Sequence, residues 1–298
     1  MINDTDRGAD CSTAPRKSLL ALAGKYQNGK STFLNCLLGG MYALEGDGTV
    51  TTKHIAKYTY GEYREAKLFL PDGTIQVLSS PMPDQIPKQE KGSTIQVSVY
   101  SPVLMKMDIL DSPGCGASKT DDREAREAVT YADMVIYVIQ KELDFEDVSF
   151  LKDITEHNKY YTVILNCLDE KAPDDADAKQ ICNAVMAKIT TEHLDRNYLP
   201  LSKEKQVYPV NLLWAQCALG YLPELEHRRK RNKIKNFMEQ DNITPLSLLE
   251  KSGFLSLRSV LTNLVALSYN IPSASMLSLA SGITEEWTSE LLKTIKGI

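Results

Sequence analysis

No apolar run in this sequence of 298 residues approaches the roughly 20 residues needed to cross a bilayer. The N-terminal stretch 1–17 is polar, mixed in charge and without the apolar core of a signal peptide, so we expect a flexible leader. The six cysteines are scattered, with no Cys-x-x-Cys pair and no histidine at ligand spacing. This pattern indicates reduced thiols of a cytoplasmic protein rather than a disulfide framework or a zinc site. Any membrane contact is expected to be peripheral.

An excess of positive charge is also missing. The chain has 34 basic and 39 acidic residues and a net charge of −5, which argues against a general nucleic-acid-binding surface. One basic run, HRRKRNKIK at 227–235, stands out. It can meet anionic lipid or RNA, but such a run is more often a solvated helix face, and we favour that interpretation. The sequence contains no internal repeat and no low-complexity segment.

What the sequence does contain is an alternation of short apolar runs and helical patterns. Strands are expected at 18–24, 54–60, 66–70, 74–78, 95–101, 103–111, 134–140, 160–166 and 206–211. Helices are expected at 31–40, 121–132, 145–157 and 176–194, and the chain reads as helical after residue 212. Strands that alternate with helices of this length predict an α/β fold, a doubly wound and mostly parallel sheet with helices on both faces.

The first motif that carries chemistry is GKYQNGKS, residues 24–31, between the first expected strand and the first expected helix. Glycines at 24 and 29 allow the backbone N–H groups of the loop to turn inward around a β-phosphate. Lys30 supplies a positive charge to the β- and γ-phosphate oxygens, and the Ser31 hydroxyl can ligate Mg²⁺. The spacing and the strand–turn–helix context predict a phosphate loop, with Gln27 and Asn28 as further nucleotide-binding residues.

Two further motifs follow expected strands. Asp111 starts the turn Asp-Ser-Pro-Gly, where a P-loop enzyme places a carboxylate near Mg²⁺ and where the Gly114 N–H can reach the γ-phosphate. Asn166-Cys167-Leu168-Asp169 follows the strand at 160–166. A carboxylate at Asp169 can accept two hydrogen bonds from guanine that adenine cannot donate, which predicts selectivity for GTP over ATP.

A threonine-rich segment, GDGTVTTKH, lies between the phosphate loop and these motifs. A loop threonine that closes over the γ-phosphate and ligates Mg²⁺ is a common switch device. Thr52 fits the spacing best and Thr51 is the alternative; a threonine-rich strand entrance is the other interpretation of this segment.

Taken together, these motifs resemble the dynamin family, and most closely its bacterial dynamin-like GTPases. The resemblance runs through GKYQNGKSTFLNCLLG, VTTKHIAKYTYG, MDILDSPG, VILNCLD, VYPVNLLWA and SGFLSLRSVL, and it covers about residues 18–267. It implies a GTPase domain over this range. The remaining segment, 268–298, contains an amphipathic stripe and is expected to form a helix that packs on the GTPase domain, pairs with a partner helix or is a truncated stalk helix.

The resemblance also assigns roles to residues. It implies phosphate contacts from Gly29, Lys30, Ser31 and Thr32, and base contacts from Asn166, Asp169 and Asn211. It implies Mg²⁺ ligation by Ser31, Asp111 and Thr52 or Thr51, γ-phosphate sensing by Gly114, and catalytic roles for Lys30 and Thr52. Gln27 is a further catalytic candidate from its own chemistry, because its polar side chain can orient a water molecule.

Three features depart from the family pattern. Tyr26 and Gln27 replace a Gln-Ser pair that sets up hydrolysis, and Cys167 replaces the lysine whose stem packs along the base. The helical stalk of the family would need several hundred further residues, so we expect a GTPase head without a full stalk.

The leading hypothesis is therefore Mg²⁺-dependent hydrolysis of GTP to GDP, slow by itself and stimulated by a nucleotide-dependent homodimer or by a partner. One alternative is a nucleotide-gated interaction module that serves a separate helical or membrane-associated partner. Another is a ribosome-associated GTPase, which depends on the basic run alone.

Overall fold

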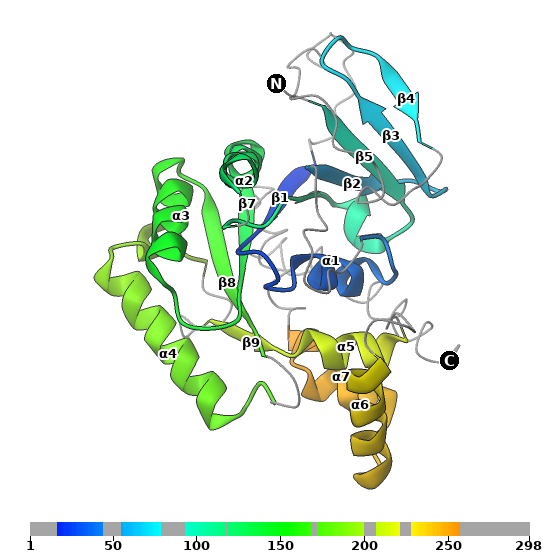
Figure 1. Ribbon diagram of the computed structural model, residues 1–298, viewed down its shortest axis with the longest axis vertical. Coiled ribbons are helices and arrows are strands. Elements are labelled where there is room, and N and C mark those ends of the chain that lie inside the picture. Colours follow the sequence, from blue (N-terminus) through cyan, green and yellow to red (C-terminus); the bar gives the residue numbers. More distant parts are fainter. Residues whose placement is uncertain are drawn as a thin grey trace, which may run out of the picture.

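A single nine-stranded sheet organises the part of the chain that this computed structural model describes, residues 17–43, 55–78, 93–116, 118–167, 172–199, 207–220 and 228–256. The strand order is β4-β3-β5-β2-β6-β1-β7-β8-β9 (Figure 1). The strands are β1 Ser18–Ala23, β2 Ala56–Tyr60, β3 Glu65–Phe69, β4 Ile75–Val77, β5 Thr94–Val99, β6 Met107–Asp111, β7 Met134–Ile139, β8 Tyr160–Asn166 and β9 Tyr208–Val210.

The half of the sheet that carries the motifs is parallel. Strand β1 lies between β6 and β7 and is parallel to both, and β7, β8 and β9 continue in the same direction. Antiparallel pairing is confined to the other half, where β2 pairs with β6, and β3 pairs with β4 and β5. The predicted α/β fold with a mostly parallel sheet is therefore confirmed.

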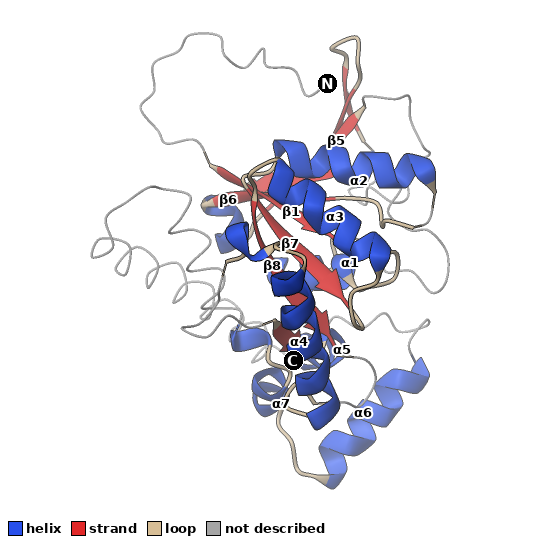
Figure 2. Ribbon diagram, turned by 90° about the vertical axis from the view of Figure 1, so that its left-hand side faces the viewer, coloured by secondary structure: helices blue, strands red, loops and turns tan. Residues whose placement is uncertain are grey.

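Helices cover both faces of the sheet, as a doubly wound fold requires (Figures 1 and 2). Figure 1 shows α2, α3 and α4 on one side of the sheet and α1, α5, α6 and α7 on the other. The α-helices are α1 Lys30–Leu38, α2 Lys119–Tyr131, α3 Phe145–Glu156, α4 Ala176–Thr191, α5 Leu212–Leu219, α6 Arg228–Gln240 and α7 Pro245–Lys251. Side chains of α1, α5 and α7 pack in one hydrophobic core, and those of α2, α3 and α4 pack in a second core on the opposite face.

The strand expected at 103–111 is wrong in its first half. Residues Pro102–Met105 form a 3-10 helix, and β6 begins only at Met107. Pro102 lies in the first turn of this helix, where its missing N–H is not needed, and Leu104 N donates to the carbonyl of Ser101 at 3.0 Å. Val103 and Leu104 are buried in this turn, which a strand pattern cannot reveal.

The short helix α1 is ended by its glycine and by a buried asparagine that the sequence analysis did not single out. Gly39 has φ +77° and closes the helix, as the Gly pair predicted. The Asn35 side chain is fully buried and holds the following turn, because its oxygen accepts from Tyr42 N at 2.8 Å and from Ala43 N at 2.9 Å.

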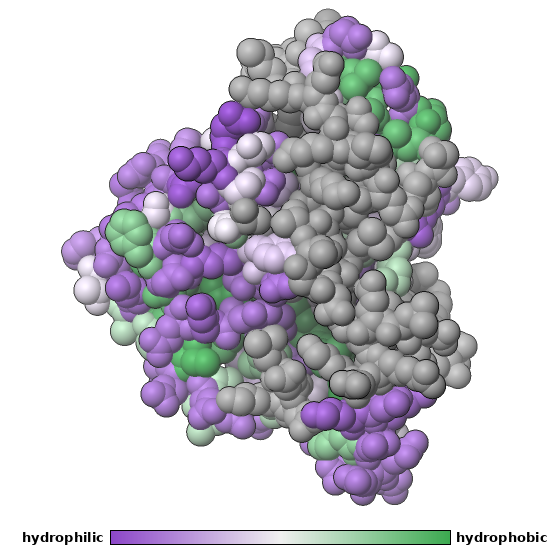
Figure 3. Space-filling view, viewed as in Figure 1, coloured by the Kyte–Doolittle hydropathy of each residue, from purple (hydrophilic) through white to green (hydrophobic). Residues whose placement is uncertain are grey.

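The described surface is mostly hydrophilic on the side of α3 and α4 and over α6 (Figure 3). Helix α6 packs through Ile234 and Phe237, and its Lys233 and Lys235 side chains are exposed. Apolar atoms gather over β3 and β4, where Ile75 and Val77 of the edge strand are exposed. Within the described ranges, no helix has the length and apolar character required to cross a bilayer.

Candidate phosphate-binding site

The loop at residues 24–31 connects β1 to α1 and is shaped by three residues with positive φ. These are Gly24 at +137°, Gln27 at +63° and Gly29 at +95°. A Cβ atom on Gly24 would lie 2.3 Å from the carbonyl oxygen of Val138, so only glycine lets β1 pass this close to β7. Gly29 is the N-cap of α1, and Phe33 N donates to its carbonyl at 2.8 Å.

This geometry leaves the N-terminus of α1 suited to an anion. The residue at its N-cap has no side chain to occupy the backbone N–H groups of the first turn, which belong to Lys30, Ser31 and Thr32. The positive end of the helix dipole lies at the same place. The predicted phosphate ligands are therefore the backbone N–H groups of the loop and of the first turn of α1, which follow one another directly along the chain.

Lys30 is buried, with 6% of its surface exposed. Its ammonium donates to the carbonyl oxygens of Gly24 at 3.0 Å and of Lys25 at 2.9 Å. Burial lowers the pKa of Lys30, and the nearby Asp111 carboxylate opposes that shift. A lysine has three N–H donors, so the two carbonyl contacts leave one for a phosphate oxygen.

The turn that starts at Asp111 lies directly against this loop. Asp111 is the register partner of Leu22 and is buried at the end of β6. A Cβ atom on Gly114 would lie 2.6 Å from Tyr26 Cα and 3.1 Å from Lys30 Nζ. The predicted metal ligand and the predicted γ-phosphate sensor are therefore adjacent to Lys30 in space, although about 80 residues separate them in the sequence.

The backbone after Gly114 extends this contact. Cys115 N donates to Gly24 O at 3.2 Å, and Tyr26 N donates to Cys115 O at 3.0 Å, so the two segments form one further step of parallel pairing. Burial raises the pKa of the Cys115 thiol to about 11.

Asn166 joins three elements rather than standing alone at the end of β8. Its Nδ2 donates to Asn28 O in the phosphate loop at 3.1 Å, and its Oδ1 accepts from Leu212 N at the start of α5 at 3.4 Å. Only 7% of its surface is exposed. The side chain therefore supports the loop, and a direct base contact from Asn166 stays a prediction.

Asn211 has a clear structural role. It is the N-cap of α5, its Oδ1 accepts from Trp214 N at 2.9 Å, and its own N donates to Ser252 O at 2.8 Å. The side chain is fully buried. A base contact from Asn211 also stays a prediction.

Three of the predicted site residues lie outside the described residues: Thr51 and Thr52, the candidate switch threonines, and Asp169, the candidate guanine-binding carboxylate. Among the residues that are described, no group of three or more His, Cys, Asp and Glu side chains could hold a metal ion. Mg²⁺ in nucleotide sites relies on one or two protein oxygen ligands plus phosphates and water, and Ser31 and Asp111 match that requirement.

Sequence reasoning missed a set of contacts that hold the loop from the β7–α3 side. Gln140 Nε2 donates to Gln27 O at 2.7 Å, Asn28 Nδ2 donates to Val138 O at 2.8 Å, and Lys25 pairs with acidic residues of α3. The Asp-x-x-Asp pattern at 144 and 147 signals a helix N-terminus, but nothing in it reveals its partner.

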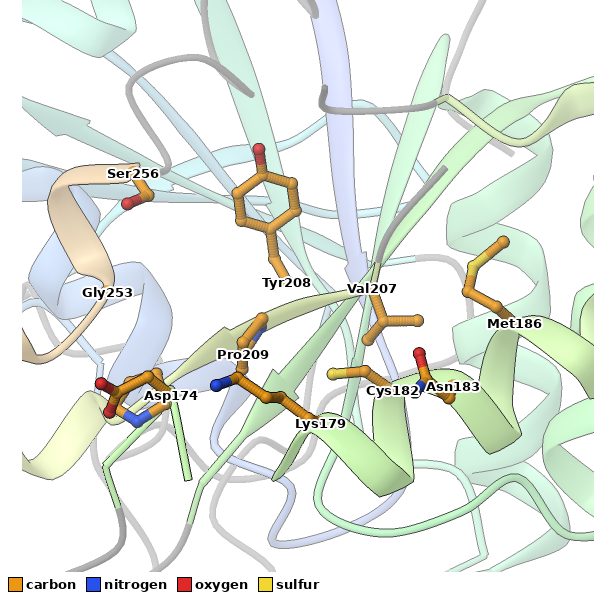
Figure 4. Close-up of a pocket in the computed structure, with 11 residues that line it drawn as sticks. Asp174, Lys179, Cys182, Asn183, Met186, Val207, Tyr208, Pro209, Gly253 and Ser256 are labelled. Atoms are coloured by element: carbon orange, nitrogen blue, oxygen red, sulfur yellow. The ribbon is translucent and has the colours of Figure 1, made fainter. Parts of the chain in front are cut away.

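A separate cavity of about 720 Å³ lies between α4, β9 and the 3-10 helix Phe254–Ser256 (Figure 4). Figure 4 shows Lys179 and Cys182 of α4 beside Pro209 and Val207. None of its lining residues belongs to the phosphate loop or to the Asp111 turn. It is a separate feature from the candidate site.

A parallel sheet whose first strand ends in this loop, with an aspartate-led turn beside it, defines a P-loop nucleotide-binding domain. Residues 20–167 match the dynamin family, and this segment belongs to that family as a dynamin-like GTPase domain.

Among individual proteins, the chain is 27% identical over 154 residues to a probable transmembrane GTPase, FZO-like and chloroplastic, from Arabidopsis thaliana. That alignment covers 51% of this chain but only 15% of the relative. One chain of an oligomerised bacterial dynamin pair, described as sensing and tethering membranes, has a TM-score of 0.47 at 14% identity. The match covers 83% of this chain and 38% of the bacterial dynamin chain. Era from Aquifex aeolicus, bound to GDP and AlF4⁻, has a TM-score of 0.39 at 21% identity, with 70% and 58% of the two chains covered.

Proposed function

We propose that this chain binds GTP with Mg²⁺ and hydrolyses the bond between the β- and γ-phosphates. The observation that carries the proposal is the convergence of Lys30, Asp111 and Gly114 on the phosphate loop of a dynamin-family domain. A loop of backbone N–H groups with a buried ammonium beside it is complementary to a triphosphate, and such an arrangement stabilises charge as it develops on the γ-phosphate.

The residues fit the metal that this chemistry requires. Ser31 and Asp111 would hold Mg²⁺, which when bound neutralises negative charge on the phosphate oxygens. Lys30 would orient the β- and γ-phosphates, and Gly114, which lies against Tyr26 and Lys30, would reach the γ-phosphate with its N–H. Gln27 is exposed at the loop surface, where its amide can orient a water molecule. Thr52 would close over the γ-phosphate, and Asp169 would select guanine.

Stimulation by a second copy is part of the proposal. Hydrolysis of this kind is accelerated strongly by an arginine that neutralises the transition state. The three nucleotide motifs contain no arginine, and two of the described arginines have other contacts: Arg64 donates to Met41 O at 3.0 Å, and Arg126 pairs with Asp153. We therefore expect slow turnover by the isolated chain and a specific activity that rises with protein concentration.

Calorimetric titration with GTP, GDP and ATP, with and without Mg²⁺, tests the nucleotide assignment. We expect GTP and GDP to bind and ATP to bind at least tenfold more weakly, because adenine cannot supply the two donors that Asp169 would accept from guanine. Lys30→Met should abolish measurable binding without unfolding the chain. Equal affinity for ATP and GTP would refute the guanine assignment, and undiminished binding by Lys30→Met would refute the site.

Static light scattering with GDP and aluminium fluoride tests the dimer. A nucleotide-dependent doubling of mass supports it. A monomer at all concentrations, with a constant specific activity, would contradict it.

A further inference from the structure

Lys25, the second residue of the phosphate loop, is held by the acidic first turn of α3. Its ammonium donates to Asp144 Oδ2, lies 3.2 Å from Glu146 Oε2 and lies 3.6 Å from Asp147 Oδ2. Only 18% of the Lys25 side chain is exposed, and the Asp147 side chain is buried at 4%. This arrangement links two segments that are separated by 119 positions in the sequence.

Two of the acidic partners, Asp144 and Asp147, are also held by hydrogen bonds that do not involve Lys25. Asp144 is the N-cap of α3, and its side chain accepts from the backbone N–H groups of Glu146 and Asp147. Asp147 completes the capping box by accepting from Asp144 N at 3.0 Å, and its other oxygen accepts from the Tyr137 hydroxyl at 2.8 Å. Carboxylates that are already ordered cost little further side-chain entropy when they bind an ammonium, unlike those of an ordinary exposed ion pair.

The ionisation states of Lys25 and Asp144 agree with this geometry. Burial disfavours the ionised form of Asp144, but the hydrogen bond and the charge of Lys25, together with the hydrogen bonds to Asp147, outweigh it and lower the pKa of Asp144 to about 2. Burial likewise works against the ammonium of Lys25, whereas the hydrogen bond to Asp144 and the charge of Asp147 raise its pKa. Both groups are therefore ionised at neutral pH.

The backbone of Lys25 connects this ion-pair cluster to the phosphate site. Its carbonyl oxygen accepts from Lys30 Nζ at 2.9 Å and from Asn28 N at 3.3 Å. The same residue forms the isolated parallel bridge with Cys115, next to Gly114. A shift of Lys25 would therefore move the acceptor that positions the phosphate-binding ammonium and the segment that carries the γ-phosphate sensor.

Two more contacts come from the same side of the molecule. Gln140 and Val138, at the end of β7, hold the loop at Gln27 and Asn28. The segment 138–147 thus makes polar contacts with the phosphate loop at three of its eight positions, and the Lys25 ion pairs are the charged part of these contacts.

We propose that Lys25 is a positioning residue of the nucleotide site, which acts through its ion pairs with the first turn of α3 to hold the carbonyl oxygen that fixes the Lys30 ammonium. It does not contact the nucleotide itself, because its ammonium is turned to α3. The proposal rests on the proposed function of the loop. It gives a role to a residue of GKYQNGKS that is not one of the predicted phosphate, metal or base ligands.

Two variants remove the ion pair from either side. Lys25→Met keeps the aliphatic stem, and Asp144→Asn removes the charge but keeps an efficient N-cap. We expect each to weaken GTP binding about tenfold, the double variant to be no weaker than the single ones, and Lys25→Arg to restore binding to within threefold of the wild type. Non-additivity is the signature of a shared interaction.

Lys152→Met is the matched control, because Lys152 makes an exposed ion pair with Glu192 at 2.9 Å on the far ends of α3 and α4. It should leave GTP affinity within twofold of the wild type. A purely stabilising role would lower the unfolding midpoint of Lys25→Met and leave the affinity of the folded protein unchanged. That result, or additive effects of Lys25→Met and Asp144→Asn, would overturn the proposal.

Amide hydrogen exchange of the nucleotide-free protein separates this inference from the proposed function. We expect residues 24–30 to exchange at least tenfold faster in Lys25→Met than in the wild type, with no change in Lys152→Met. If the wild type binds no nucleotide, the proposed function fails, while the exchange rates still decide whether Lys25 positions the loop. Unchanged exchange at residues 24–30 would refute the positioning role.

Discussion

Replacing Gly29 by alanine separates two constraints on the phosphate loop, its backbone conformation and its packing against β8. Gly29 has φ +95°, and a Cβ atom added there would lie 2.5 Å from Asn166 Nδ2. Asn166 would have to move, and it would lose its hydrogen bond to Asn28 O at 3.1 Å. The substitution therefore adds a steric conflict to an unfavourable φ.

The magnitude follows from the two contributions. A non-glycine residue in this region costs about 1–2 kcal/mol, part of which is offset because alanine restricts the unfolded chain. Loss of the Asn166 hydrogen bond adds about 1 kcal/mol. We expect Gly29→Ala to lower the free energy of unfolding by about 2–3 kcal/mol.

Gly73 provides the matched control. It has φ +88°, and a Cβ atom there would meet nothing within 4 Å, so Gly73→Ala has the conformational cost without the contact. Urea denaturation of nucleotide-free protein, with the slope held constant between variants, measures both. Gly73→Ala should cost about 1 kcal/mol. In an Asn166→Ala background, the further cost of Gly29→Ala should fall to the same value.

Equal destabilisation by Gly29→Ala and Gly73→Ala would refute this reasoning, because it would mean that the contact with Asn166 carries no energy. The two variants should also differ in function. Gly29→Ala should weaken GTP binding by at least tenfold, whereas Gly73→Ala, in the turn between β3 and β4, should leave it unchanged.

Three further results are expected. Asp111→Asn should make GTP affinity insensitive to Mg²⁺, which titrations with and without the metal would show; a retained Mg²⁺ effect would contradict the assignment. Asn35→Ala should cost about 3 kcal/mol in urea denaturation, because Tyr42 N and both backbone groups of Ala43 lose their partner. Burial raises the pKa of Cys115 to about 11, so at pH 8 its thiol should react with iodoacetamide far more slowly in the folded protein than in protein unfolded by urea. The rate for the folded protein should increase as the pH rises. Equal rates, mapped by mass spectrometry, would contradict its burial.

Much of the fold could be predicted because its signals are local. The loop GKYQNGKS, the turn at Asp111 and the alternation of strands and helices each occupy a few consecutive residues, and their spacing reflects the periods of strands and helices. The strand predicted at 103–111 was wrong in its first half because a buried 3-10 turn and a strand can share the same apolar residues. Sheet order was not predicted, since it depends on which strands pair across long loops.

The sequence by itself thus determined that a P-loop lies after the first strand and that an aspartate turn and an Asn-x-x-Asp motif follow later strands. Only the tertiary structure decided what supports that loop. Because β1 lies between β6 and β7, the loop at its end meets Gly114 on one side and the start of α3 on the other. The hydrogen bond from Asn166 to Asn28 and the ion pairs of Lys25 each join positions more than 100 residues apart, and no local pattern encodes such a pairing.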